Sequence, residues 1–295
     1  MDWDKLRLFR AVADAGSFTG ASSRLNLSQP AISRQIRSLE EGLGTALFFR
    51  HARGLVLTQE GSALLQTVKE VTTKLDATER SIRDQGDMPS GRLKVTTAMA
   101  IGVYWLVPML AEFFQIYPKV RINLVLDDDE LNLSEGEADV AIRFRPAQNA
   151  DLVQRPLLRV NHHVYGSMEY LSRVGVPETV EDLDQHQIIT YGPDVPLPIR
   201  DVNWLAAVGR SGEARQAQLS INNIYGVYRA VRNGIGLAAI PDYLITETDG
   251  LQRVLTGLEV PSFDTYFVYP EELRGLPRLV AFRDFLFDKA KSSTL

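Results

Sequence analysis

The chain has 295 residues, of which 45% are hydrophobic and 23% charged, and it contains no cysteine. This composition excludes disorder as the main state, and the lack of cysteine excludes disulfides, thiolate metal sites and a cysteine nucleophile. Residues 1–58 hold eight Lys and Arg against five Asp and Glu, a charge of +3 in a chain whose formal net charge is −5. A basic first segment on an acidic body favours a polyanion as the partner of that segment.

The N-terminus is charged throughout its first ten residues and lacks the apolar core of a signal peptide. We find no apolar run near the roughly 18 residues that a membrane-spanning helix needs. The sequence therefore predicts a soluble cytoplasmic protein with no membrane partner.

Residues 1–58 predict three short helices followed by a hairpin. Apolar residues of the first segment share one helical face, and the second helix can be capped by Ser17 or Thr19. The third helix begins after the N-cap Ser28 and ends at Gly44. Two short apolar stretches between residues 47 and 57 then predict the hairpin, or wing.

The third helix carries a predicted buried face of Ile32, Ile36, Leu39 and Leu43. A short helix after a tight turn, with polar and basic groups on its other face, suits the major groove of DNA, where Gln and Arg read base edges. Its N-terminus favours phosphate, and Arg53 at the hairpin tip suits a neighbouring minor groove. The polar face comprises Pro30, Arg34, Arg37, Ser38 and Glu41, with Ser33 on its flank and Gln29 at the N-terminal tip of the helix.

Residues 59–91 predict one long helix and a hinge. Six residues recur at spacings of four and three, which is a heptad stripe with one polar member. The stripe favours a seam between two such helices in a dimer, and the alternative is a helix packed on its own domain. The stripe comprises Leu64, Val68, Val71, Leu75, Thr78 and Ile82.

Residues 92–295 alternate strands and helices, which predicts an α/β domain with mostly parallel sheets. Its length allows two lobes, with lobe I at about 92–160 and 266–295 and lobe II at about 161–265. In open α/β sheets, ligands bind beyond the carboxyl ends of the strands. The positions selected by this rule are Thr96, Thr97, Ala98, Met99, Asp127, Asp128, Asp129, Phe144, Arg145, Asn203, Ser220, Ile221, Asn222 and Asn223.

These positions offer polar groups to a small ligand. Thr97 and Asn222 present a hydroxyl and an amide, and Arg145 can pair with an anion. The backbone amides after Thr97 open a helix and suit a carboxylate. Residues 127–130 favour a surface loop over a cation site, because hard-metal ligands converge from more places.

Other classes of protein explain less of the sequence. No Gly-x-Ser-x-Gly elbow supports a hydrolase, and Gly234-x-Gly236 is too short for a dinucleotide-binding loop. A solute-binding protein would explain two lobes but not the first 91 residues. His162 and His163 are neighbours on a strand and point to opposite faces, so we predict no zinc site. Since these motifs are lacking, we also predict no cofactor and no enzymatic activity.

The stretch from residue 16 to residue 61 resembles the winged helix-turn-helix of LysR-type transcriptional regulators. The matching residues are Gly16-Ser17-Phe18, Ser28-Gln29-Pro30-Ala31-Ile32-Ser33, Ile36, Leu39-Glu40, Leu43-Gly44, Leu47-Phe48, Arg50 and Leu57-Thr58 with Gly61. Further along, Ala138-Asp139-Val140-Ala141-Ile142-Arg143 and Gly234-Ile235-Gly236-Leu237 with Pro241 also resemble the family.

The resemblance implies a winged helix-turn-helix at 1–58, a linker and dimerisation helix with a hinge at 59–91, and an effector domain like a periplasmic binding protein at 92–295. It implies a sequence-specific regulator that binds double-stranded DNA as a dimer or tetramer. A small-molecule effector between the lobes would alter the DNA complex, and an activator would also contact RNA polymerase.

The resemblance also assigns roles to residues of the first domain. For Arg37, an ion pair with Glu40 or Glu41 on the helix surface is the alternative to a DNA contact. The implied DNA contacts are Gln29, Pro30, Ser33 and Arg34 at base edges, Arg37 near the backbone, Ser17 and Thr19 at phosphates, and Arg53 in the wing.

Overall fold

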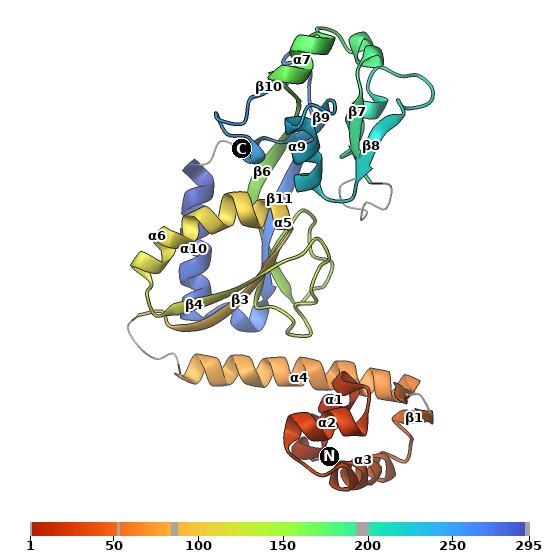
Figure 1. Ribbon diagram of the computed structural model, residues 1–295. Helices are drawn as coiled ribbons and strands as arrows, with labels where there is room; N and C mark the ends of the chain where they lie inside the picture. Colours follow the sequence, from red (N-terminus) through yellow and green to blue (C-terminus); the bar gives the residue numbers. More distant parts are fainter. Residues whose placement is uncertain (1, 52–53, 84–87, 193–200, 293–295) are drawn as a thin grey trace. The chain divides into compact units, whose positions relative to one another are not determined.

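The computed structural model describes residues 2–51, 54–83, 88–192 and 201–292 (Figure 1). The chain divides into two compact units. The first is Met1–Arg83 with Ser134–Glu137, and the second is Asp84–Leu133 with Ala138–Leu295.

The first unit has three helices, a two-stranded antiparallel hairpin and a long helix, as predicted. Phe9, Val12, Ala21, Ile32 and Ile36 are fully buried at its centre, so each of the three short helices contributes to one core. The elements are α1 (Trp3–Ala15), α2 (Phe18–Leu25), α3 (Gln29–Leu43), β1 (Phe48–His51), β2 (Gly54–Leu57) and α4 (Gln59–Arg83).

The helix ends follow the local sequence closely. The Ser17 hydroxyl accepts the backbone N–H of Gly20 at 3.0 Å, so Ser17 caps α2. Gly44 ends α3 in the left-handed region with φ 71°. Ser28 occupies the N-cap position of α3 but makes no side-chain capping hydrogen bond. Leu43 was wrongly predicted to be buried: it is 37% exposed, because the last turn of α3 extends past the core.

Helix α4 uses its apolar stripe in two ways. Leu64 and Val68 pack into the core of the first unit, which is the alternative considered for this helix. Val71 and Leu75 are 39% and 46% exposed. The stripe is therefore covered by its own domain at the start and open to solvent further on, while the side chains of Thr78 and Ile82 lie outside the described part.

The second unit is built on a mixed seven-stranded sheet of order β10-β6-β11-β5-β3-β4, with β9 also paired to β6. Strand β3 pairs in parallel with β4 and β5, whereas β6 and β11 make antiparallel pairs. The prediction of mostly parallel sheets is wrong at these two long strands, because they run through both lobes (Figure 1). The strands are β3 (Gly91–Thr97), β4 (Val120–Leu126), β5 (Val140–Arg143), β6 (Leu152–Ser167), β9 (Ala238–Pro241), β10 (Leu251–Val254) and β11 (Ser262–Pro270), with β7 (Ile188–Tyr191) and β8 (Ala217–Ile221) as a separate parallel pair.

Helices cover the sheet in each lobe. Lobe I contains β3, β4 and β5, and there Phe113 of α6 packs on Phe282 and Phe285 of α10, with ring centroids 5.4 and 5.3 Å apart. Lobe II contains β7 to β10, with Val231 of α9 and Ile240 of β9 fully buried. The longer helices are α6 (Val107–Ile116), α7 (Met168–Val174), α9 (Ile224–Arg232) and α10 (Pro277–Ser292), and the short ones are α5 (Met99–Ile101), η1 (Gly102–Leu106), η2 (Glu181–Gln185), α8 (Trp204–Ala207), η3 (Asp242–Leu244) and η4 (Glu271–Leu273).

One helical segment of lobe I corrects an expectation. Among the described residues, only Met99–Ile116 is long and apolar enough to cross a membrane by length and composition, with a mean hydropathy of 1.5. The expectation that no such run exists is therefore wrong. Core helices of soluble proteins pass the same test, and here Trp105, Leu106 and Phe113 are buried inside the domain. The segment contributes these side chains to the core of lobe I, and 33% of it is buried.

Candidate functional site

Helix α3 separates its apolar and polar residues onto two faces. Ile32, Ile36 and Leu39 are buried in the core, and this burial fixes the rotation of the helix. The opposite face is open to solvent, with Arg34 placed to donate from Nε to the Pro30 carbonyl oxygen at 3.3 Å. The exposed side chains of this face include Gln29, Pro30, Arg34, Arg37 and Glu41, while Ser33 is half-buried.

Two hydrogen-bonded links hold α3 to its neighbours. The Glu40 carboxylate accepts the backbone N–H of Leu47 at 2.8 Å and of Phe48 at 3.4 Å, which ties α3 to β1. Lys5 Nζ donates to the Ser38 hydroxyl at 2.8 Å, which ties α1 to α3. Ser38 is therefore half-buried against α1 rather than part of the open polar face.

The turn before α2 lies next to the wing. The backbone N–H of Leu55 donates to the Gly16 carbonyl oxygen at 3.1 Å, which joins β2 to this turn. Ser17 is half-buried in its capping role and Thr19 is exposed. Arg53, the predicted wing arginine, lies outside the described residues.

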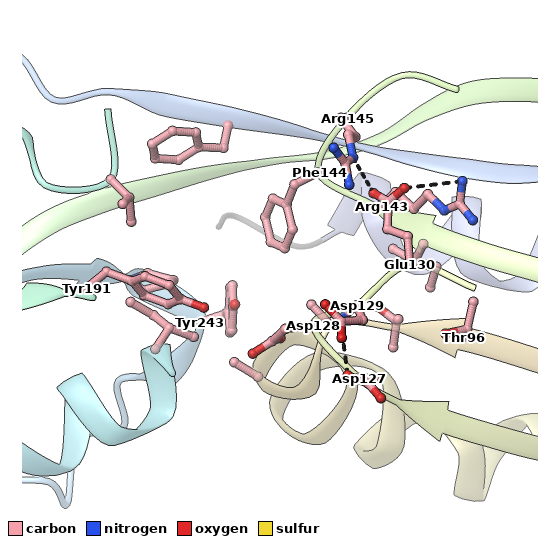
Figure 2. Close-up of a pocket in the computed structure, with 18 of the residues that line it drawn as sticks. Thr96, Asp127, Asp128, Asp129, Glu130, Arg143, Phe144, Arg145, Tyr191 and Tyr243 are labelled. Carbon is pink, nitrogen blue, oxygen red and sulfur yellow. Dashed lines mark hydrogen bonds and ion pairs between the residues drawn. The ribbon is translucent and has the colours of Figure 1, made fainter. Parts of the chain in front are cut away.

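The second unit contains a cavity where β3, β4 and β5 end (Figure 2). It encloses about 890 Å³ of empty space, part of which is open to solvent, and both lobes contribute to its walls. The sequence-selected residues that line it are Thr96, Thr97, Ala98, Asp127, Asp128, Asp129, Phe144 and Arg145. Lining residues missed by the sequence analysis include His162, Tyr191, Val202, Ile224, Pro241, Tyr243 and Phe263.

Six of the selected positions lie outside the lining of this cavity: Met99, Asn203, Ser220, Ile221, Asn222 and Asn223. The Asn203 side chain exchanges hydrogen bonds with the backbone N–H and carbonyl of Tyr191, at 2.8 and 2.9 Å, so it holds the end of β7. Met99 is exposed next to Asn223, whose Nδ2 lies 3.8 Å from its sulfur. Asn222 is exposed at the end of β8.

The two arginines of the cavity lining already have partners within the protein. Arg145 donates from Nε to Glu130 at 2.7 Å, and Arg143 Nη1 lies 3.4 Å from the other oxygen of the same carboxylate. Arg143 also donates to the carbonyl oxygen of Leu131. The predicted anion partner Arg145 is thus already paired with Glu130, which it shares with Arg143 (Figure 2).

The backbone amide predicted to receive a carboxylate is occupied as well. Asp128 accepts the backbone N–H of Met99 at 3.2 Å with Oδ1. Its other oxygen accepts from Asn223 Nδ2 at 3.3 Å. Because Asn223 caps α9 in lobe II, this hydrogen bond joins the two lobes at the cavity.

Three polar atoms of the cavity lining are buried without a hydrogen-bond partner within the described part of the chain: Thr97 Oγ1, Arg143 Nε and His162 Nδ1. Such an atom costs roughly 1–3 kcal/mol when it stays unsatisfied, so a cluster of them indicates bound water or a ligand. Burial lowers the pKa of His162 to about 3, so its ring is neutral. That ring packs edge-on against Phe263, with centroids 4.6 Å apart.

The remaining walls are largely aromatic. Burial and the charge of Asp128 raise the pKa values of Tyr191 and Tyr243, so both remain neutral phenols. Tyr243 follows the carboxyl end of β9, so the strand-end rule would have selected it if applied there. Within the described ranges, no group of three or more His, Asp or Glu side chains is arranged to hold a metal ion.

The first unit is a helical domain with an open helix face that carries Arg34 and Arg37, and the second is a two-lobed α/β domain with a ligand-sized cavity. Together they define a DNA-binding protein with a small-molecule-binding domain. The chain belongs to the LysR family of transcriptional regulators. The family described as "bacterial regulatory helix-turn-helix protein, lysR family" matches residues 3–62, and the LysR substrate binding domain matches residues 86–291.

Individual relatives support this assignment. The chain is 32% identical over 292 residues to the HTH-type transcriptional regulator CrgA of Neisseria meningitidis serogroup B, covering 97% of this chain and 96% of that protein. The solved structure of CrgA from N. meningitidis has a TM-score of 0.61 at 27% identity, covering 98% and 99% of the two chains. The full-length virulence activator AphB of Vibrio cholerae has a TM-score of 0.60 at 26% identity, with the same coverage. The chain is therefore a DNA-binding transcriptional regulator and not an enzyme.

Proposed function

We propose that this regulator binds an interrupted palindrome in double-stranded DNA by placing α3 of each of two winged-helix domains in a major groove. The open face of α3 carries the proposal, because the buried Ile32, Ile36 and Leu39 direct Gln29 and Arg34 outward. The major groove admits one α-helix, and glutamine and arginine form bidentate contacts with adenine and guanine there.

Each residue of this surface has a proposed role. The helix N-terminus and the turn before α2 face the phosphates, and the wing lies at a minor groove. The proposed base contacts are Gln29, Pro30, Ser33 and Arg34, the proposed backbone contacts are Arg37, Ser17 and Thr19, and Arg53 is the proposed wing contact.

Replacing Arg34 by alanine is expected to weaken binding to the cognate site by about 1–3 kcal/mol and to relax specificity at one base pair, because a base contact is lost. Cognate sites come from sequencing the genomic DNA retained by the purified chain, and affinities from fluorescence anisotropy on single-base variants. Arg7→Ala, which removes an exposed arginine from α1, is the control and should leave specificity unchanged. An equal loss on all sequences would make Arg34 a phosphate contact instead.

The assembly proposed here is a dimer that associates further into a tetramer, in the cytoplasm. The exposed Val71 and Leu75 of α4 support a helix–helix seam, since apolar residues at this spacing pair in coiled coils. An activator would also contact RNA polymerase. The proposed division is 1–58 for DNA binding, 59–91 for the linker, and 92–295 for the effector, with lobe I at about 92–160 and 266–295 and lobe II at about 161–265.

The cavity between the lobes is the proposed effector site, with Thr96, Thr97, Ala98 and Arg145 in its lining and Met99, Asn203 and Asn222 beside it. Three unsatisfied polar atoms and the aromatic walls support a small organic ligand. An effector alters the DNA complex only if it binds two arrangements of the protein with different affinity.

Ligand binding is expected to change the footprint and the bend of the target DNA. Metabolite pools are screened by thermal shift for a compound that stabilises the chain, and the DNA complex is then footprinted with and without it. Ala98→Phe, which fills part of the cavity, should lose this response and keep basal DNA binding. Identical footprints and bends in the free and ligand-bound states would contradict the proposal.

A further inference from the structure

We infer that the ligand of this cavity carries a positively charged nitrogen, an ammonium or guanidinium, on a compact aromatic or apolar body. This inference rests on the proposed effector site and specifies the charge of its ligand. The sequence analysis named an anion as the candidate ligand. The charges of the cavity lining decide between an anionic and a cationic ligand.

The two elements that suit an anion are already engaged by carboxylates of the protein. Glu130 lies 2.7 Å from Arg145 Nε and 3.4 Å from Arg143 Nη1. Asp128 accepts the backbone N–H of Met99 at 3.2 Å. A ligand carboxylate would therefore share these groups with carboxylates that already bond to them, and the like charges would repel it.

The remaining charge of the lining is negative. Four carboxylates and two guanidiniums line the cavity, a net charge of −2, and the neutral His162 adds no positive charge. Among the described residues, no lysine or arginine pairs with Asp127, Asp128 or Asp129. Apolar walls concentrate the field of these carboxylates on whatever occupies the cavity, which favours a cation.

Buried polar atoms supply an independent indication that a ligand binds here. Thr97 is 2% exposed and His162 is 4% exposed, and both line the cavity with an unpartnered atom. The Thr97 hydroxyl accepts or donates, and so does a neutral imidazole according to its tautomer. Arg143 Nε–H lacks an acceptor within the described residues, so an oxygen on the ligand would add to its affinity.

The aromatic walls favour an organic cation over a metal ion. Phe144, Tyr191, Tyr243 and Phe263 line the same space as the acidic residues. Organic cations gain energy over aromatic faces, and no metal-holding group of three or more side chains lies in the described part. The cavity thus places carboxylates at one side of an apolar body (Figure 2).

A cation at Asp128 also competes for the hydrogen bond between the lobes. Asn223 Nδ2 donates to Asp128 across the cavity at 3.3 Å. An ammonium or guanidinium group makes stronger bonds to a carboxylate than a neutral amide does. The charged end of the ligand therefore acts on the bond that joins lobe I to lobe II.

Three probes of similar shape and different charge test the inference on the full chain at pH 7: 2-phenylethylamine, 2-phenylethanol and 3-phenylpropionate. Calorimetry should give at least tenfold tighter binding for the amine than for the alcohol, with the acid weakest. Asp129→Asn should reduce the preference for the amine at least threefold. Asp288→Asn removes an exposed carboxylate of α10 outside the cavity lining and should leave the preference unchanged.

Equal or tighter binding of the acid, or no binding of any probe, would overturn the inference. Footprinting the same preparations separates this result from the proposed function. If the acid binds and alters the DNA complex, the effector site stands and the inferred charge is wrong. If the amine binds with the expected preference and the DNA complex does not change, the charge stands and the proposed coupling fails.

Discussion

Replacing Gly61 by alanine is expected to destabilise the DNA-binding unit by about 3 kcal/mol, because the added Cβ has no room. It would lie 2.1 Å from the carbonyl oxygen of Leu47, a backbone atom. That backbone is held on both sides, since Leu47 N–H donates to Glu40 at 2.8 Å and Leu47 O accepts from Thr58 N–H at 3.0 Å. Relieving the clash therefore means separating α4 from the hairpin.

Urea unfolding followed by circular dichroism, together with DNA binding at 25 °C and 37 °C, measures this effect. Gly42→Ala is the matched control, because Gly42 is exposed within α3 and has no atom near the position of an added Cβ. Alanine there should be neutral or stabilise the unit by up to about 1 kcal/mol. Equal stabilities of the two variants would refute the close approach of Gly61 to Leu47.

Acidification is expected to destabilise the effector domain through His162. Burial lowers the pKa of this histidine from 6.5 to about 3 in the folded state, whereas the unfolded chain binds its proton near pH 6.5. Between these values the unfolded state holds more protons, so the free energy of unfolding falls as the pH falls. The contribution is about 1.4 kcal/mol per pH unit, or roughly 3 kcal/mol by pH 4.5.

The measurement is the free energy of unfolding of wild type and His162→Leu between pH 7.5 and pH 4.5. The variant should lose this part of the pH dependence and keep the part due to other groups, among them His186, whose pKa is also lowered by burial. Parallel curves for the two proteins would mean that His162 accepts a proton in the folded state. A ligand that bonds to the neutral His162 ring should keep its affinity as the pH falls, until the pH at which this ring binds a proton in the folded protein.

Local signals in the sequence were sufficient for the first unit. The helices and the hairpin could be predicted because their signals affect only nearby residues. These signals are the periodic apolar residues, the cap at Ser17 and the glycine at position 44. Leu43 shows the limit of the method, because periodicity places it on the apolar face but does not show where the core ends. The same limit applies to the α4 stripe, where only Leu64 and Val68 meet the core.

The side-chain pairs of the cavity could not be predicted from local sequence, because they join distant parts of the chain. The strand-end rule selected Thr97 and Arg145, but nothing near Arg145 in the sequence reveals that it pairs with Glu130, 15 residues earlier. Asp128 meets Asn223 across 95 residues. Sequence reasoning therefore selected residues that line the cavity, but it did not predict which side chains pair with them.

The two strands shared by the lobes determine how this domain can deform. Strand β6 pairs with β11 from Asn161 to Leu152, with a single register shift at Thr265/Tyr266. There, the buried Thr265 hydroxyl donates to Leu158 O at 3.2 Å and accepts from Leu158 N–H at 3.1 Å. A paired ribbon resists stretching and opening more than torsion, so we expect any relative motion of the two lobes to be a twist of β6 and β11. The register shift and the two hydrogen bonds at Thr265 lie within this ribbon, and we expect them to contribute to its resistance to twisting.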